Sequence, residues 1–184
     1  MIRVVAAVAE ELGDLQGSAL GVGMLPAGIA MARLLANERP DAVVLLGTAG
    51  AYASGPEIGQ VVAARTVGLV SGTAALGKGY VPRAPGPIET DPALRGGLPE
   101  VDVATLVAIT IDPALATLVG AHWQVEHMEA YGVAAACAAV GVPFGAVLGI
   151  TNRVGPDAHA EWKAHRVAAQ AAAVGAVARL LAGR

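Results

Sequence analysis

The segment from Tyr131 to Thr151 constrains the fold most, because it carries no charged residue. Its length would suit a membrane span. However, Ala and Gly dominate it, and the turn-forming triplet Gly141-Val142-Pro143 divides it in two. We therefore predict a buried helix of small residues over 128–140 and a buried strand over 142–150, and no transmembrane span.

Polar groups stand at both ends of this segment. Glu126 and Glu129 precede it, and Asn152 follows it in a predicted polar turn over 151–153. A further helix is expected over 158–181, with Asp157 as its N-cap. A carboxylate at the start of one helix and an amide at the end of the next strand can face the same pocket. We predict that they do.

The rest of the chain continues the alternation of apolar strands and helices. Such a pattern is typical of a parallel or mixed sheet covered by helices on both faces. The prediction is an α/β fold: a three-layer α/β/α sandwich with a mixed, mostly parallel central sheet, forming one domain over 1–184. The remaining expected elements are strands over 3–9, 19–23, 42–46, 58–70 (bent at Gly68) and 101–111, and helices over 29–38 and 114–118. The stretch 71–97 is expected to be irregular, and stretches of this length are usually functional or mobile.

Composition excludes several classes of protein. Apolar residues make up 55% of the chain and charged ones 15%, which argues against disorder. The net charge of −3, without a basic cluster, argues against nucleic-acid binding. The single cysteine, Cys137, excludes an intrachain disulfide and fits a reducing cytoplasm. The amino-terminal segment does not have the pattern of a signal peptide, so we predict a cytoplasmic protein with no membrane partner.

Two further places could meet a ligand. Glu10 and Glu11 end the first apolar run, either as a solvated turn or at the ligand edge of the sheet. Gly47-Thr48-Ala49-Gly50 follows the strand over 42–46, either as a plain tight turn or as a loop that a ligand approaches closely. The glycines at 21, 23 and 28 do not form a dinucleotide fingerprint, and the histidines at 122, 159 and 165 lack metal-ligand spacing, so no metal is expected.

Several segments, taken together and in order, resemble the nucleoside phosphorylase and nucleosidase family, which includes methylthioadenosine/S-adenosylhomocysteine nucleosidases and futalosine hydrolases. They are VVAAVAEEL, GVGMLPAG, LLGTAGAY, IGQVVAA, VEHMEAYGVA and GITNRVGPDAHAEW. The forms Glu-x-Met-Glu and Thr-Asn-x-Val-Gly, followed by Trp162, resemble the futalosine hydrolase branch; methylthioadenosine nucleosidases usually show Glu-Met-Glu and Ser-Asp. The resemblance is weakest over 70–97, where this chain looks shortened.

The resemblance implies a nucleoside phosphorylase-like fold and a ribose site. Glu129 would accept hydrogen bonds from ribose hydroxyls, and Met128 would pack under the ribose ring. Glu126 would be a further binding residue, or else a structural carboxylate. Thr48, with Ala49 and Gly50, would border the ribose and the attacking water. His127, at the variable position of the motif, is given no role. The purine base of the nucleoside is expected to bind near 111–115.

The resemblance also implies the chemistry. Glu11, rather than Glu10, would be the general base that deprotonates water. Asn152 stands where adenine-specific relatives have Asp, and its amide can donate to the 6-oxo group of hypoxanthine. Core packing remains an alternative for Trp162, and a plain turn residue for Asn152.

The expected reaction is hydrolysis of a 6-oxopurine nucleoside, most simply futalosine, in a route to menaquinone. Because GVGMLPAG and GTAGA contain no Arg that could hold phosphate, hydrolysis is favoured over phosphorolysis. No cofactor is expected, and the family implies a homo-oligomer. The alternatives are a methylthioadenosine/S-adenosylhomocysteine nucleosidase and a non-catalytic nucleoside-binding protein.

Overall fold

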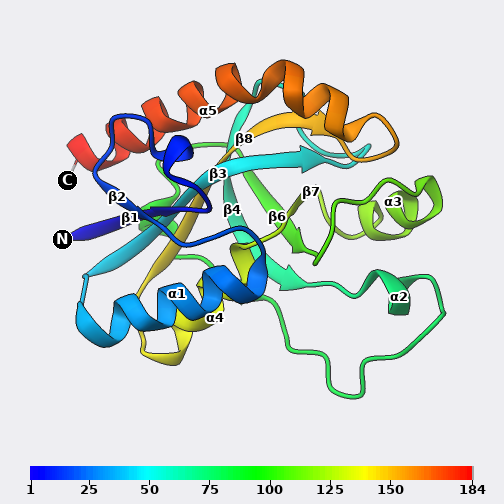
Figure 1. Ribbon diagram of the computed structural model, residues 1–184, viewed down its shortest axis with the longest axis horizontal. Helices are drawn as coiled ribbons and strands as arrows, with labels where there is room; N and C mark the ends of the chain where they lie inside the picture. Colours follow the sequence, from blue (N-terminus) through cyan, green and yellow to red (C-terminus); the bar gives the residue numbers. More distant parts are fainter. Residues whose placement is uncertain (184) are drawn as a thin grey trace.

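The computed structural model describes residues 1–183, and Figure 1 shows strands and helices alternating along the chain. The strands are β1 (Ile2–Ala6), β2 (Gly17–Ala19), β3 (Ala42–Ala51), β4 (Val61–Leu69), β5 (Ile88–Glu89), β6 (Glu100–Thr105), β7 (Val125–His127) and β8 (Phe144–Arg153). The helices are α1 (Met24–Asn37), α2 (Gly72–Ala75), α3 (Pro113–Gly120), α4 (Ala130–Ala139) and α5 (Ala158–Ala182), with 3₁₀ turns η1 (Ala9–Leu12) and η2 (Pro92–Leu94). The predicted α/β class is confirmed.

The strands form a mixed sheet, as predicted. Strand β3 pairs in parallel with β1 and β8, and β6 pairs in parallel with β4 and β7. Antiparallel pairings join β3 to β7, β4 to β5 and β4 to β8. One feature was not expected: β3, β7, β6, β4 and β8 pair in a closed ring. Ring closure leaves no free edge among these strands, and it brings β3, β7 and β8 together.

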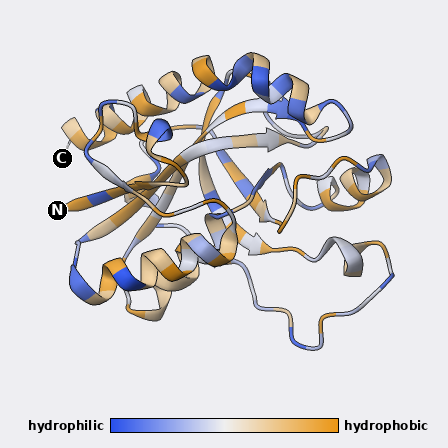
Figure 2. Ribbon diagram, viewed as in Figure 1, coloured by the Kyte–Doolittle hydropathy of each residue, from blue (hydrophilic) through white to orange (hydrophobic). Residues whose placement is uncertain are grey.

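Helices pack against two sides of the sheet (Figure 1). Along β3, Val43 and Leu45 join a core cluster that includes buried residues of α1 and α4. Val44 and Leu46 join a second cluster with buried residues of α5. Neighbouring side chains of a strand point to opposite faces. Because both faces of β3 are covered, this strand is apolar throughout its first half. Figure 2 shows apolar residues along the strands and hydrophilic ones on loops and helix surfaces.

Small residues let α1 and α4 approach each other closely. A Cβ on Gly132 of α4 would lie 2.3 Å from the carbonyl oxygen of Met24, at the start of α1. A Cβ on Gly28 would lie 3.3 Å from the carbonyl oxygen of Gly132. This close packing explains the Ala- and Gly-rich sequence of α4, and it holds the start of α1 beside the start of α4.

Several predicted boundaries were wrong in an instructive way. Thr48, Ala49 and Gly50 are strand residues of β3, although the sequence predicts a loop there. The register of β3 against β8 shifts between Ala49 and Gly50. Asn152 belongs to β8 and not to a turn. Both strands continue because they pair with each other beyond the apolar run, so backbone pairing extends them into small and polar residues.

Other details also differ. The irregularity in β4 lies between Ala64 and Thr66, not at Gly68. At Gly68 the ring of Trp123 takes the space of a side chain, since a Cβ there would lie 2.1 Å from that ring. Asp157 occupies the N-cap position of α5, but its side chain makes no capping hydrogen bond. The segment 131–151 forms α4 and β8, and within residues 1–183 no helix has the length and apolar character needed to cross a membrane.

Candidate active site

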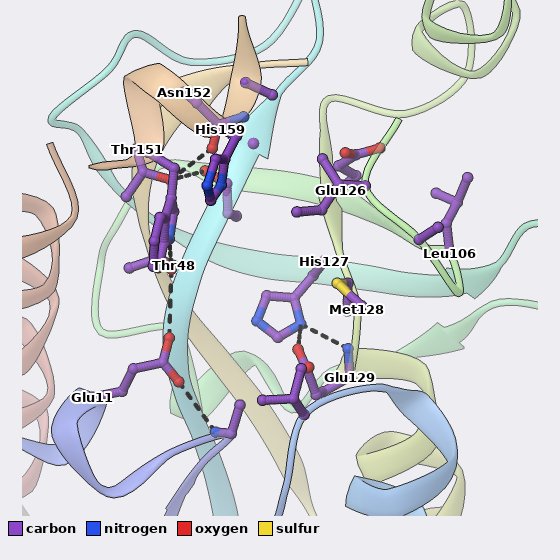
Figure 3. A pocket seen from close by; sticks show the side chains of 18 of the residues that line it. Glu11, Thr48, Leu106, Glu126, His127, Met128, Glu129, Thr151, Asn152 and His159 are labelled. Atoms are coloured by element: carbon purple, nitrogen blue, oxygen red, sulfur yellow. Dashed lines mark hydrogen bonds and ion pairs between the residues drawn. The ribbon is translucent and has the colours of Figure 1, made fainter. Parts of the chain in front are cut away.

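A cavity of about 400 Å³ opens where β3, β7 and β8 meet η1 and the first turns of α5. Figure 3 shows its polar side chains facing one another across this space. All eight residues that the sequence proposes for the site line it: Glu11, Thr48, Ala49, Gly50, Glu126, Met128, Glu129 and Asn152. The structure therefore brings together the two ends of the segment that begins at β7, as predicted.

Glu11 projects from η1 into the cavity, whereas the neighbouring Glu10 is exposed. One Glu11 oxygen accepts the backbone N–H of Ala7 at 3.2 Å. The other accepts the Thr48 hydroxyl at 3.4 Å, and that hydroxyl accepts the indole N–H of Trp162 at 3.4 Å. Hydrogen bonds of 3.4 Å are long, and catalytic hydrogen bonds are often long before substrate binds.

Burial raises the pKa of Glu11 above its usual value, and the negative charge of Glu129 adds to the rise. His127 and the backbone donors Val8 and Ala7 act in the opposite direction and lower this pKa. A carboxylate with a raised pKa is a better proton acceptor once it is ionised. Its place in the cavity and its raised pKa make Glu11 the candidate for a general base.

Glu129 is the N-cap residue of α4 and is 5% exposed. One of its oxygens accepts the backbone N–H of Gly23 at 2.6 Å. The other lies 3.2 Å from Nδ1 of His127. Because an ionised carboxylate has about four acceptor positions, Glu129 can still accept hydrogen bonds from a ligand. Met128 precedes it and lines the same side of the cavity.

Glu126 is held differently. The Tyr52 hydroxyl donates to one of its oxygens at 2.9 Å, and the backbone N–H of Thr110 donates to the other at 3.0 Å. Burial raises the pKa of Glu126, and the hydrogen bonds from Thr110 and Tyr52 oppose that rise. Both oxygens thus have protein partners, so Glu126 ties the segment after β6 to the cavity wall.

Asn152 lies at the end of β8 and is 6% exposed. Its Oδ1 accepts the Thr151 hydroxyl at 2.8 Å, and its Nδ2 donates to the carbonyl of Arg153 at 3.0 Å. One N–H of the amide and one acceptor position of Oδ1 remain for a ligand. A Cβ on Gly50 would lie 2.8 Å from Nδ2, so glycine at this position leaves room for the amide.

Sequence reasoning missed several lining residues. Leu106 and Ile109 line the cavity, and the segment 111–115, which was expected to hold the base, does not. The predicted strand over 101–111 ends at Thr105 in the structure, so Leu106 and Ile109 lie in the segment beyond it and not inside a strand. His159 and Trp162 lie one helical turn apart on α5 and stack, with ring centroids 5.9 Å apart. His127, to which no role was given, also lines the cavity and is buried.

The lining carries no Arg or Lys among the residues that the structure describes. Phosphate sites normally use such cations or a cradle of backbone N–H groups. Within residues 1–183 there is also no group of three or more His, Cys, Asp or Glu side chains that could hold a metal ion.

The model of the phosphorylase superfamily matches residues 13–183. This chain belongs to the phosphorylase superfamily. Futalosine hydrolase of Thermus thermophilus is 31% identical over 183 residues, covering 88% of this chain and 79% of that protein.

Solved structures of other proteins share the fold of this chain. Native futalosine hydrolase of Helicobacter pylori has a TM-score of 0.85 at 15% identity, covering 100% of this chain and 97% of that one. The methylthioadenosine/S-adenosylhomocysteine nucleosidase of Neisseria meningitidis, in complex with methylthio-immucillin-A, has a TM-score of 0.81 at 19% identity, covering 100% of this chain and 99% of that one.

Proposed function

We propose that this protein hydrolyses the N-glycosidic bond of a 6-oxopurine nucleoside, and that futalosine is its substrate. The products would be hypoxanthine and dehypoxanthine futalosine. The observation that carries the proposal is the arrangement of one cavity, with Asn152 on β8 and the two carboxylates Glu11 and Glu129 on other walls (Figure 3). The identity of 31% to a futalosine hydrolase supports it.

In the proposed reaction, Glu11 acts as the general base. It takes a proton from a water molecule, whose oxygen forms a bond to C1′ of the ribose. The C1′–N9 bond breaks, and its electron pair leaves with the purine, which takes up one proton from solvent to give hypoxanthine. Glu11 returns its proton to solvent. General base catalysis typically contributes about 10²–10⁴ in rate. Thr48, which donates to Glu11 at 3.4 Å, would help to place that water.

Glu129 and Met128 hold the ribose in this proposal. The Glu129 carboxylate accepts hydrogen bonds from ribose hydroxyls, which are stronger than bonds between neutral groups. Its bond from the Gly23 N–H at 2.6 Å fixes the carboxylate before the sugar arrives. Met128 supplies an adaptable apolar surface beneath the ring, and Ala49 and Gly50 border the sugar on the β3 side.

Asn152 selects the base in this proposal. Its free N–H donates to the 6-oxo group of the leaving hypoxanthine, which favours the developing negative charge. An adenine, which presents an amino donor at that position, would face this N–H without an acceptor. A mismatch of this kind at a buried polar group can produce large discrimination.

Hydrolysis, and not phosphorolysis, is proposed because no Arg or Lys of residues 1–183 lines the cavity. No cofactor or metal takes part in the proposed reaction. The alternative function is that of a methylthioadenosine/S-adenosylhomocysteine nucleosidase, which the shared fold favours. The pathway we propose is a route to menaquinone in the cytoplasm.

The finer description of the fold is also proposed: one three-layer α/β/α domain, supported by the two core clusters on either side of β3. We further propose a homo-oligomer. Exposed apolar side chains at the start of α1 and after β6 support it: Val22, Leu25, Ile29, Val107, Ile109 and Ile111. Sedimentation of the purified protein at the monomer mass would contradict the oligomer.

A comparison of nucleosides tests the proposed function. Purified protein is incubated with futalosine, inosine and methylthioadenosine, and the released base is separated by chromatography. The proposal expects hypoxanthine from futalosine at the highest rate. Faster release of adenine from methylthioadenosine would favour the alternative enzyme. Binding of futalosine without release of a base from any of the three would instead indicate a nucleoside-binding protein.

A further inference from the structure

His127 is the buried titratable group of the cavity that the proposed reaction leaves without a role. Its side chain is 4% exposed, although it lines the cavity. It stands between Glu126 and Glu129 in the sequence, on β7, and Figure 3 shows its ring between the Glu129 side and the Glu11 side of the cavity. The carboxyl group on which His127 acts is that of Glu11, whose pKa it lowers.

One ring nitrogen of His127 is held by the start of α4. Nδ1 accepts the backbone N–H groups of Glu129 at 3.1 Å and of Ala130 at 3.2 Å. The neutral ring therefore carries its proton on Nε2, because Nδ1 is occupied as an acceptor. A protonated ring would turn Nδ1 into a donor to the Glu129 oxygen 3.2 Å away, and it would keep the proton on Nε2. In both states Nε2 is a donor.

The other ring nitrogen faces Gly47 and Glu11. A Cβ built on Gly47 would lie 2.9 Å from Nε2 of His127 and 3.7 Å from Oε1 of Glu11. The imidazole thus uses space over β3 that only a glycine leaves open. Glu11 Oε1 is also the oxygen that the Thr48 hydroxyl reaches at 3.4 Å.

We propose that His127 is a positioning residue that links the start of α4 to Glu11: its Nδ1 is held by the backbone N–H groups of Glu129 and Ala130, and its Nε2–H is presented to the side of Glu11. This inference rests on the proposed role of Glu11 as the base. The Nε2–H stabilises the ionised form of Glu11, which is the form that can take a proton from water. His127 therefore keeps the base active over a wider range of pH.

The charged groups around Glu11 agree with this role. Those that act on its ionisation are His127 from β7, which lowers its pKa, and Glu129 from the start of α4, which raises it. On the side of α5, Trp162 acts through Thr48, and neither of these groups titrates near neutral pH. His159 of α5 also lines the cavity, but it is not among the groups that shift the pKa of Glu11. Removal of His127 would leave only the backbone donors Val8 and Ala7 to oppose burial and the charge of Glu129, and the pKa of Glu11 would rise further.

Two substitutions test the two ring nitrogens of His127 separately. His127→Asn keeps a polar atom near Nδ1 but nothing at Nε2, whereas His127→Gln keeps a polar donor toward Nε2. We expect His127→Asn to lower kcat roughly tenfold, the size of about one pKa unit of electrostatic interaction with Glu11, with a smaller change in KM. The acid limb of its kcat/KM profile moves to higher pH. His127→Gln moves that limb less, and His122→Asn, an exposed control outside the cavity, leaves it in place.

A titration that needs no turnover completes the test. The carboxyl carbon of Glu11 is followed by ¹³C NMR and assigned by its absence in Glu11→Gln. We expect its midpoint to rise in His127→Asn, and also in Gly47→Ala, whose added Cβ displaces the ring. An unchanged midpoint and acid limb in the folded variants would overturn the inference. If the wild type releases no base from any nucleoside, the proposed function fails, and the NMR midpoint still decides the link between His127 and Glu11.

Discussion

The cavity has two polar walls that are built differently. On the β7–α4 wall, Glu126 and Glu129 receive hydrogen bonds of 2.6–3.0 Å from Tyr52, Thr110 and Gly23. On the η1–β3 wall the hydrogen bonds are 3.2–3.4 Å long: Ala7 and Thr48 donate to Glu11, and Trp162 donates to Thr48. Short bonds fix a group before substrate arrives, and long bonds leave it free to take a new partner. We infer that the β7–α4 wall binds the nucleoside and that the η1–β3 wall positions and deprotonates the water.

Of the substitutions proposed for the two walls, Glu11→Gln should lower activity most. The amide keeps the size of the side chain but cannot take a proton from water, so kcat should fall about 10²–10⁴-fold while substrate affinity is largely retained. Steady-state rates and the Kd for futalosine measure both quantities. Glu10→Gln is the matched control. Full activity of Glu11→Gln would show that another residue is the general base.

The raised pKa of Glu11 also predicts how kcat/KM depends on pH. The ionised form of Glu11 is the active one, and burial raises its pKa above the ordinary value of 4.5. The kcat/KM of the wild type should therefore rise with pH through an acid limb whose midpoint lies above 4.5. An acid limb at or below that value would contradict a buried base.

Glu129→Gln probes the other wall. Loss of charge weakens the hydrogen bonds from ribose hydroxyls, each worth about 1.5–3 kcal/mol when one partner is charged. We expect affinity for the nucleoside to fall roughly ten- to a hundredfold. Binding can be measured with the turnover-deficient Glu11→Gln background. An affinity equal to that of the parent would remove Glu129 from the ribose site.

Asn152→Asp tests base selection at the junction of the two walls. A carboxylate can accept from the 6-amino group of adenine, or donate when protonated, whereas the amide suits a 6-oxo group. The ratio of adenine release to hypoxanthine release should rise by about tenfold or more. Competition between methylthioadenosine and futalosine in one reaction measures this ratio. If this ratio does not change, Asn152 does not determine which purine base is released.

Tyr52→Phe should have the smallest effect on catalysis and a clear effect on stability. It removes the hydroxyl that donates to Glu126 at 2.9 Å and leaves a buried oxygen without that donor. The free energy of unfolding should fall by about 1–3 kcal/mol.

The matched variant Glu126→Gln has a pH signature. Because the pKa of Glu126 is raised in the folded protein, its contribution to stability is present at low pH and is lost as pH rises through that pKa. Wild-type stability relative to Glu126→Gln should thus fall as pH rises. Denaturant unfolding at several pH values checks both variants. If wild-type stability relative to Glu126→Gln instead rises with pH, Glu126 is stabilised mainly as an anion.

Sequence reasoning reached the α/β class and the mixed sheet because apolar runs mark buried strands, and the resemblance to the family supplied the eight proposed residues that line the cavity. It could not find β7, since three residues carry too little periodicity, nor the closed ring, which depends on pairing between distant strands. The bond from Tyr52 to Glu126 joins residues 74 positions apart. His127 was given no role because the residue type at a variable motif position does not indicate where its ring points.

The most direct test of the central claim is the identity of the sugar product from futalosine, followed by mass spectrometry with and without added phosphate. The account predicts free hypoxanthine and an unphosphorylated sugar, formed at the same rate in both buffers. Dependence on phosphate, or a sugar carrying a phosphate at C1′, would contradict it.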